Sequence, residues 1–306
     1  MMEKKGGDSV TIIGIIPGYP KHTKNNVFSG IKMPPTGILS VLTNLDPGYE
    51  AYCIDENNYK GPLDFTGMPD HEFLDKIKPA DFVFLYGGMS NSIPRMYSIA
   101  QFYKKLGCTV VAGGSHVDAL PKEALGRGVD IVVHGEGEET AKEILEAIRS
   151  NKSLSKIPGI SYLENGDYIF TGTREPIKDL DSLKAPDLTL VRYMKKRFSA
   201  IPISRGRGCN FKCEFCVVNK QYGNFKLRSP KKIVEDIVKY SDLGYKEFFF
   251  TDDNFAQDID DTIKLCGMIS DLKRKFNKTI RITVQVRTEV ADNSVLIRAM
   301  RSAGVT

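Results

Sequence analysis

The first half of the chain alternates short apolar runs with segments of helical spacing. The apolar runs are rich in β-branched residues and end in glycine or proline, a pattern typical of buried parallel strands. They lie at 9–17, 50–55, 81–88, 109–114 and 130–138, and helical periodicity occurs at 34–45, 71–79, 94–107 and 139–150. Five strands that alternate with helices predict an α/β fold, with a doubly wound, Rossmann-like parallel sheet over residues 1–150.

The second half repeats a strand and a helix three times. Strands are expected at 200–208, 246–254 and 280–290, and helices at 229–244, 259–276 and 294–304. This order predicts the beginning of a barrel-like parallel array over residues 200–306. Between the halves, residues 151–199 contain a hairpin signal, two short strands around the turn of 164–167, and then a polar, proline-spaced stretch. We place a hairpin and connector there.

Glycines follow three of the N-terminal strands directly. They are Gly87 and Gly88, Gly113 and Gly114, and Gly135 and Gly137. Ligands of open α/β sheets bind along the carboxyl edge of the strands, and glycine lets the backbone approach a ligand closely. A single glycine pair after a strand is more often an ordinary tight turn. Three glycine pairs along one edge of the sheet favour a binding site for a large ligand with a phosphate or amide periphery. No G-x-G-x-x-G follows the first strand, so a dinucleotide is not expected.

Three of the six cysteines fall within eight residues, as C-N-F-K-C-E-F-C. Thiolates select zinc or iron–sulfur clusters. Structural zinc needs a fourth ligand, and no histidine follows His134. A cluster with four irons held by Cys209, Cys213 and Cys216 would keep one iron open, as catalysis requires. We therefore expect a 4Fe–4S cluster, with a zinc-stabilised module as the alternative.

The composition of the chain excludes several classes of protein. The 306 residues are 41% hydrophobic, without an apolar run long enough to span a membrane, and the net charge of +5 comes from lysines interleaved with acids. We expect neither a membrane span nor a nucleic-acid partner. No export signal opens the chain, so the cysteines indicate the cytoplasm and not a disulfide framework. Cys53, Cys108 and Cys266 are expected to be buried small hydrophobes.

The spacing C-x-x-x-C-x-x-C, with Phe215 before the last cysteine, resembles the signature of radical S-adenosylmethionine (SAM) enzymes. In that family the three cysteines hold a 4Fe–4S cluster that cleaves SAM to a 5′-deoxyadenosyl radical. The family fold is a partial (β/α)6 barrel, of which residues 200–306 would form the first half. The resemblance implies SAM contacts at Phe215, Asp252, Asp253, Asn254, Gln285 and Arg287, the last two on alternate positions of the third strand.

The first half resembles the cobalamin-binding domain that precedes the barrel in one branch of this family. The blocks "PPTGILSVL", "IDEN", "GGSHVDALPKEAL" and "HGEGEET" occur in the usual order. The resemblance implies cobalamin contacts at Pro35, Gly37, Gly87, Gly88, Met89, Ser90, Gly113, Gly114, Ser115, His116, Gly135, Glu136 and Gly137.

A cobalt-binding histidine is not expected. The pattern D-x-H-x-x-G is absent after the first strand, and His22 in that loop lacks the aspartate that would orient its ring. His116 and His134 are expected to be structural histidines with satisfied hydrogen bonds.

The resemblance implies a cobalamin-dependent radical SAM enzyme that methylates an unactivated carbon of a small-molecule substrate. An electron donor such as flavodoxin or ferredoxin is implied. The alternatives are a cyclase or rearrangement enzyme, a methylthiotransferase, for which the first half has too few cysteines, and a non-catalytic cobalamin carrier. The substrate and the catalytic residues are not predicted. Because three of six barrel units are present, we expect a piece of a longer protein, an exposed flank on strand 280–290, and poor SAM cleavage by this piece.

Overall fold

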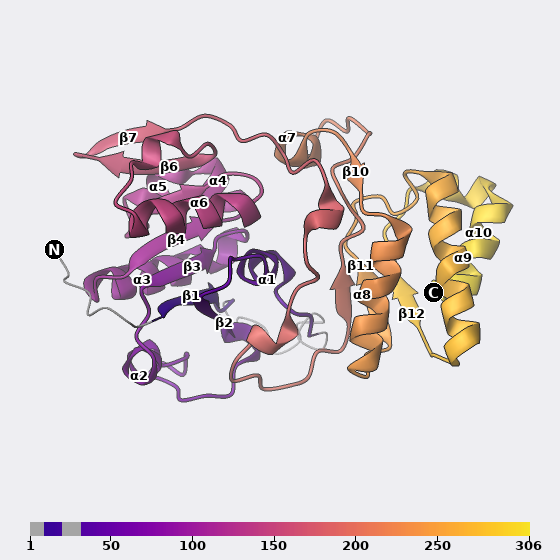
Figure 1. The fold of residues 1–306 in the computed structure, drawn as a ribbon, viewed down its shortest axis with the longest axis horizontal. Helices are drawn as coiled ribbons and strands as arrows, with labels where there is room; N and C mark the ends of the chain where they lie inside the picture. The colour runs from indigo at the N-terminus through magenta and orange to yellow at the C-terminus, as the bar shows by residue number, and fades with distance from the viewer. Residues whose placement is uncertain (1–8, 20–31) are drawn as a thin grey trace. The chain divides into compact units, whose positions relative to one another are not determined.

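The computed structural model describes residues 9–19 and 32–306 (Figure 1). These residues form two compact units. The first takes in 9–19, 35–175 and 186–196, and the second takes in 32–34, 176–185 and 197–306. Among the described residues, none of the helices combines the length and apolar character needed to cross a bilayer.

A seven-stranded sheet, in the order β2-β1-β3-β4-β5-β6-β7, forms the centre of the first unit. The expected parallel strands are β1 (Val10–Ile16), β2 (Tyr49–Asp55), β3 (Phe82–Tyr86), β4 (Thr109–Gly113) and β5 (Ile131–Val133). The expected hairpin forms as β6 (Ile160–Glu164) and β7 (Asp167–Phe170). It does not stand in a separate connector, because β6 pairs antiparallel with β5 and extends the sheet.

Helices cover both faces of this sheet. They are α1 (Thr36–Thr43), α2 (His71–Ile77), α3 (Ile93–Lys105), α4 (Ser115–Ala119), α5 (Pro121–Leu125) and α6 (Glu138–Arg149). Short 3₁₀ turns are η2 (Glu56–Asn58), η3 (Ser90–Ser92), η4 (Leu154–Lys156) and η6 (Leu188–Leu190). The sequence did not predict α4 and α5, which are short because Pro121 interrupts the helical run and starts a new helix.

Strand β1 shows why the sheet needs a helix on each side. Ile13 and Ile15 pack into the core that includes Met96 of α3. Gly14 faces the opposite side, where an added Cβ would lie 2.8 Å from Leu42 Cδ1 of α1. Side chains alternate across a strand, so β1 is buried on both faces and α1 sits close against the glycine. The predicted doubly wound sheet is confirmed.

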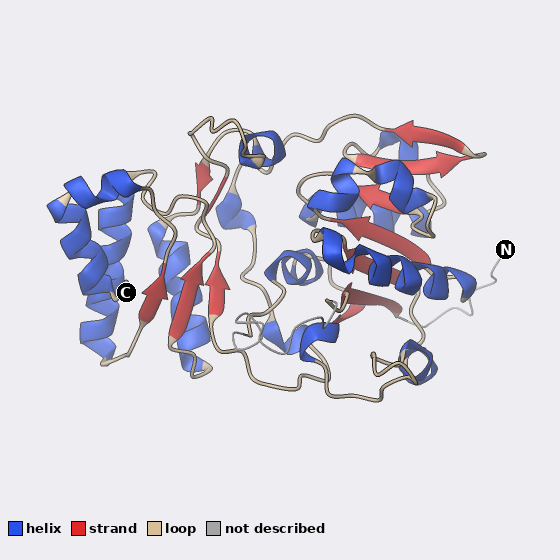
Figure 2. Ribbon diagram, turned by 180° about the vertical axis from the view of Figure 1, so that it is seen from behind, coloured by secondary structure: helices blue, strands red, loops and turns tan. Residues whose placement is uncertain are grey.

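The second unit contains three parallel strands in the order β12-β11-β8. They are β8 (Ile201–Ile203), β11 (Glu247–Phe250) and β12 (Arg281–Thr283), each followed by a helix, α8 (Pro230–Asp242), α9 (Ile259–Phe276) and α10 (Ser294–Ala303). Figures 1 and 2 show α8 against one face of these strands. The expected threefold repeat of strand and helix is confirmed. Smaller elements are β9 (Gly206–Arg207), β10 (Lys226–Leu227), α7 (Val218–Tyr222) and η5 (Leu180–Ser182).

The expected strand at 280–290 is too long. Strand β12 ends at Thr283, and a 3₁₀ helix, η7 (Thr288–Asp292), follows an extended segment. The segment leaves the sheet because the N–H of Phe255 donates to the carbonyl of Gln285 at 2.8 Å, which ties it to the loop after β11. Gln285 and Arg287 therefore lie beyond the strand, not on it.

The outer flank of β12 is also not fully open. Ile282 donates its N–H to the carbonyl of Gly304 at 2.8 Å and accepts from the N–H of Thr306 at 3.0 Å. Ile282 thereby forms a parallel bridge with Val305. The expected exposed flank is paired at this position.

Candidate functional site

The three clustered cysteines occupy the loop that follows β8 and β9. Cys209, Cys213 and Cys216 are partly exposed and carry free thiols. The N–H of Cys216 donates to the carbonyl of Cys213 at 3.0 Å, which closes a turn over the C-x-x-C. Within residues 9–19 and 32–306, no group of three or more His, Cys, Asp or Glu side chains is gathered as a metal site. The loop therefore supplies three soft donors, which suit iron–sulfur or zinc, without converging them on one point.

A buried arginine fixes the start of this loop. Arg205 is 1% exposed. Its guanidinium donates to the Phe255 carbonyl, to Oγ1 of Thr262 at 2.9 Å and to Oδ2 of Asp261 at 2.7 Å. These contacts attach the end of β8 to the first turn of α9. We did not predict this role, because an arginine among glycines in "SRGRG" is normally exposed.

Asp252 lies at the end of β11, beside the start of the cysteine loop. Its Oδ2 accepts the backbone N–H of Arg205 at 3.1 Å. Burial raises the pKa of Asp252 to about 6. Within the described part of the chain, Oδ1 of Asp252 and Oδ1 of Asn254 are buried without a hydrogen-bond partner. The strand end thus offers two acceptors that no described protein donor satisfies.

The other predicted SAM contacts are placed differently from one another. Nε2 of Gln285 approaches the Asp252 carbonyl at 3.4 Å, so these two residues are brought together. Asp253 is exposed next to Asp252, and partial loss of hydration around its carboxylate raises its pKa. Phe215 is 90% exposed. Arg287 lies against the cysteine loop, with its guanidinium carbon 3.9 Å from the centroid of the Phe211 ring.

Two kinds of glycine occur at the carboxyl edge of the first unit's sheet. Gly114, at φ +121°, lies so close to the β3 loop that an added Cβ would be 2.7 Å from the backbone N of Gly88. The N–H of Gly87 donates to the carbonyl of Gly113 at 2.7 Å. These glycines serve the packing of two loops on each other. At Gly37 and Gly135, by contrast, no described atom outside the adjacent residues and the local helix backbone lies within 4 Å of the Cβ position. That open space is compatible with a close ligand.

The remaining predicted cobalamin residues fall into two groups. Pro35 and Gly37 open α1, and 135–137 open α6; the helices adjoin, and Oγ of Ser40 donates to Oε1 of Glu138 at 2.6 Å. Met89 and Ser90 lie at the start of η3 after β3, and Ser115 and His116 open α4 after β4. The structure therefore brings residues that are distant in sequence to one edge of the sheet.

The histidines are held by neighbours. Nδ1 of His134 contacts the Asp118 carboxylate and Nε2 lies 2.7 Å from Oγ of Ser161, so His134 is a structural histidine, as expected. Nδ1 of His116 lies 2.9 Å from Oγ of Ser90. Its Nε2 is buried without a partner among the described residues, so the expectation that His116 has all its hydrogen bonds satisfied is wrong at this nitrogen. His22 lies outside the described residues.

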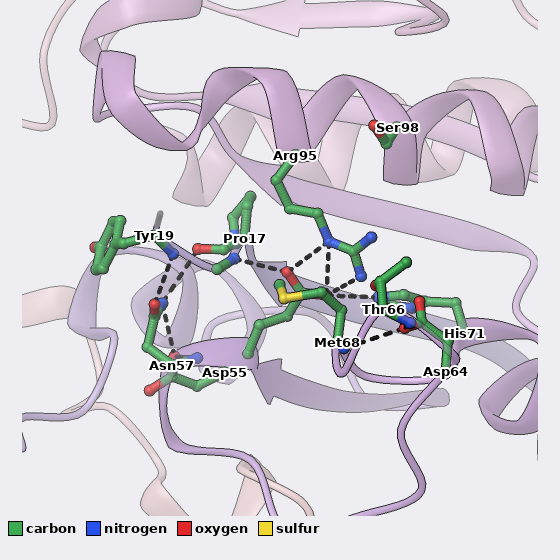
Figure 3. Close-up of polar contacts among 12 residues, drawn as sticks. Pro17, Tyr19, Asp55, Asn57, Asp64, Thr66, Met68, His71, Arg95 and Ser98 are labelled. Atoms are coloured by element: carbon green, nitrogen blue, oxygen red, sulfur yellow. Dashed lines mark hydrogen bonds and ion pairs between the residues drawn. The ribbon is translucent and has the colours of Figure 1, made fainter. Parts of the chain in front are cut away.

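A fully buried carboxylate anchors the exit of β1, and the sequence did not indicate it. Oε2 of Glu56 accepts the N–H of Gly18 at 2.6 Å, and Oε1 pairs with Arg95 at 2.6 Å and with His71 at 3.0 Å. Figure 3 shows the guanidinium of Arg95 pointing toward the side where Thr66 and His71 lie. Burial alone would raise the pKa of Glu56, but hydrogen bonds from His71 and Arg95 hold that pKa below its usual value.

Comparison with known families defines the class of protein. The family model described as "B12 binding domain" matches residues 31–145, and the model described as "Radical SAM superfamily" matches residues 203–306. The chain therefore combines a B12 binding domain with a radical SAM domain, the two domains that the sequence resemblance implied. The resemblance found in the sequence is confirmed.

Curated relatives are similar at modest identity. Uncharacterized methyltransferase PH0819 of Pyrococcus horikoshii is 32% identical over 169 residues, covering 52% of this chain and 37% of the relative. Anaerobic magnesium-protoporphyrin IX monomethyl ester cyclase of Cereibacter sphaeroides is 26% identical, covering 64% of this chain and 33% of the relative. Hopanoid C-3 methylase of Methylococcus capsulatus is 28% identical, covering 59% of this chain and 35% of the relative. The chain spans about a third of the length of these relatives.

Solved structures share the fold. The radical SAM methyltransferase TsrM from Kitasatospora setae, with cobalamin and a [4Fe-4S] cluster bound, superposes with a TM-score of 0.77 at 17% identity, covering 97% of this chain and 60% of TsrM. The cobalamin-dependent enzyme OxsB, with aqua-cobalamin and SAM bound, superposes with a TM-score of 0.73 at 14% identity, covering 97% of this chain and 43% of OxsB. The predicted fold class is confirmed.

Proposed function

We propose that this chain is the cobalamin- and cluster-binding part of a radical SAM enzyme that methylates an unactivated carbon of a small molecule. One observation carries the proposal: three free thiols lie in one loop after the first strand of a barrel-type unit. A matched B12 binding domain precedes that unit. Cys209, Cys213 and Cys216 would hold a 4Fe–4S cluster. When bound, the cluster supplies the electron that cleaves SAM to a 5′-deoxyadenosyl radical.

The chain's own residues would bind and orient SAM beside this loop. Oδ1 of Asp252 and Oδ1 of Asn254, both buried and without a described partner, could accept hydrogen bonds from the amino group of SAM. Arg205 would hold the loop in register with β11 through its backbone bond to Asp252. Phe215 and Asp253, both exposed, and Gln285 would flank the ligand.

Cobalamin would lie on the carboxyl edge of the first unit's sheet. The open space at Gly37 and Gly135 supports close approach of the corrin there. Ser90, Ser115 and Glu136 would serve its amide periphery as polar groups. His116 is bound to Ser90 through Nδ1, with Nε2 buried, which supports cobalt without a protein histidine.

A cyclase is the second candidate, because several curated relatives are anaerobic magnesium-protoporphyrin IX monomethyl ester cyclases. The products separate the two reactions. A methylase transfers a methyl group and releases S-adenosylhomocysteine in step with 5′-deoxyadenosine. A cyclase releases no stoichiometric S-adenosylhomocysteine.

The proposed chemistry also implies a partner and a compartment. Cluster reduction takes one electron at low potential, so a donor such as flavodoxin or ferredoxin is expected. Oxygen-sensitive clusters and free thiols persist in a reducing compartment, and we therefore place the reaction in the cytoplasm.

The test is formation of 5′-deoxyadenosine from SAM by the reconstituted, cobalamin-loaded protein under dithionite. Because poor SAM cleavage is expected of this piece, a low but cluster-dependent activity is expected, equal in the wild type and in Cys266→Ala, whose thiol is buried in α9. It should disappear in Cys213→Ala. Equal product from Cys213→Ala and the wild type would contradict the proposal.

A further inference from the structure

Arg287 is a cation held against the cysteine loop. It immediately precedes η7, and its guanidinium carbon lies 3.9 Å from the centroid of the Phe211 ring. Phe211 stands between Cys209 and Cys213. A guanidinium over an aromatic face is attracted by the negative potential of the ring. This contact joins the segment after β12 to the middle of the cysteine motif.

The guanidinium has two further partners. Its Nε and Nη2 donate to Oε1 of Glu289 at 3.0 Å and 2.6 Å. The charge of Arg287 also interacts with the side chain of Cys213, and a guanidinium stays protonated in proteins at any working pH. The hydrogen bond from Arg287 in turn holds the pKa of Glu289 below its usual value. The cation therefore lies between one carboxylate and one cysteine.

This arrangement differs from an ordinary surface ion pair and from the SAM contact that the family resemblance implies. Exposed Arg–Glu pairs contribute little to stability and need no third partner. Here contacts from Phe211 and Cys213 meet Arg287 across more than 70 residues of sequence. Glu289 already occupies the Nε and Nη2 edge of the guanidinium, so a SAM carboxylate would have only the Nη1 edge left.

We propose that Arg287 is a positioning residue of the cysteine loop and raises the reduction potential of the cluster that the three cysteines hold. This inference rests on the proposed function. Reduction adds one electron, supplied by the external donor, to a site already made negative by three thiolates, and no covalent bond changes. A fixed positive charge beside the ligand sulfurs favours the more negative, reduced state.

The experiment compares the wild type with Arg287→Met, Arg287→Lys and Glu289→Gln after anaerobic reconstitution. Iron and sulfide are counted, and the midpoint potential is measured without SAM by redox titration followed by paramagnetic resonance. We expect Arg287→Met to favour the oxidised form by about tenfold, a fall of about 59 mV for one electron. Arg287→Lys should retain most of the wild-type potential, because it retains the charge. Glu289→Gln should raise the potential, because the cation loses its neutralising partner.

Each outcome decides the inference. A full cluster with the wild-type potential in Arg287→Met overturns it, as does an equal fall in Arg287→Lys. If Arg287→Met takes up no cluster, Glu289→Gln decides: a raised potential supports the inference and an unchanged or lower one overturns it. Failure of the wild type to take up iron and sulfide would instead overturn the proposed function, so the two failures are distinguishable.

Discussion

The backbone N–H of Arg205 donates to Oδ2 of Asp252 at 3.1 Å, which joins the ends of β8 and β11 where the cysteine loop begins. Both residues are buried, at 1% and 5% exposure. One oxygen of the carboxylate is thus engaged, while Oδ1 has no partner in the described part of the chain. Asp252 combines a structural role with an open acceptor.

This burial makes the stability of the protein depend on pH. The pKa of Asp252 is raised to about 6, above its unfolded value, so the folded state binds the proton more tightly. The stabilising effect is complete below the unfolded pKa and is lost as pH rises through the folded pKa. We expect the unfolding free energy of the wild type to fall by up to about 3 kcal/mol between pH 4 and 7. The Asp252→Asn variant should not show this fall. Denaturant titrations at both pH values would show parallel behaviour of the two proteins if this were wrong.

The contribution of Glu56 to stability should depend on pH in the opposite sense. Its pKa is lowered in the fold, so its contribution is present above the unfolded pKa and is lost as pH falls through the folded one. We expect Glu56→Gln to lower the unfolding free energy at pH 7 by about 3 kcal/mol, because Arg95 and His71 lose a buried partner. Glu72→Gln, in the exposed pair with Lys76, is the control and should change little. Equal stability of both variants would argue against the buried network.

Gly37 offers a way to separate cobalamin binding from folding. It lies in α1 with open space at its Cβ position, so Gly37→Ala should raise the unfolding free energy by about 0.5–1 kcal/mol. If the corrin approaches there, the same change should weaken cobalamin retention. Gly267→Ala in α9 is the matched control, since no described atom outside the adjacent residues and the local helix backbone lies within 4 Å of its Cβ position either. Unchanged cobalamin retention in Gly37→Ala would place the ligand elsewhere.

The lower face of cobalt gives a spectroscopic prediction. The paramagnetic resonance spectrum of the Co(II) form should lack nitrogen splitting from a protein ligand. Nδ1 of His116 is bound to Ser90 and its Nε2 is buried, and both ring nitrogens of His134 have partners. Splitting that disappears in His116→Ala or His22→Ala would identify a histidine ligand and contradict this expectation.

Local patterns predicted most strands and helices. The apolar run of β1 and the glycine-closed ends of β3 and β4 are properties of short segments, so they could be identified from sequence. The turn of the β6–β7 hairpin was equally clear, since Asn165 and Gly166 both adopt positive φ. That β6 pairs with β5 could not be predicted, because a hairpin signal does not specify its neighbour in the sheet.

Long-range polar contacts explain the structural features that the sequence did not predict. Residues 284–287 keep the alternation of a strand, but the bond from Phe255 to Gln285 draws them away from the sheet. Arg205 and Glu56 are buried only because partners from distant segments satisfy their charges. The cysteine spacing indicated the candidate site, whereas the contact of Arg287 with Phe211 depends on where β12 ends.

The central claim is that Cys209, Cys213 and Cys216 hold an iron–sulfur cluster. Anaerobic reconstitution followed by iron and sulfide analysis tests it most directly. The account predicts about four irons and four sulfides per chain, lost when all three cysteines are replaced by alanine and retained in Cys266→Ala. One zinc per chain without sulfide would contradict it and would leave the loop as a structural metal site.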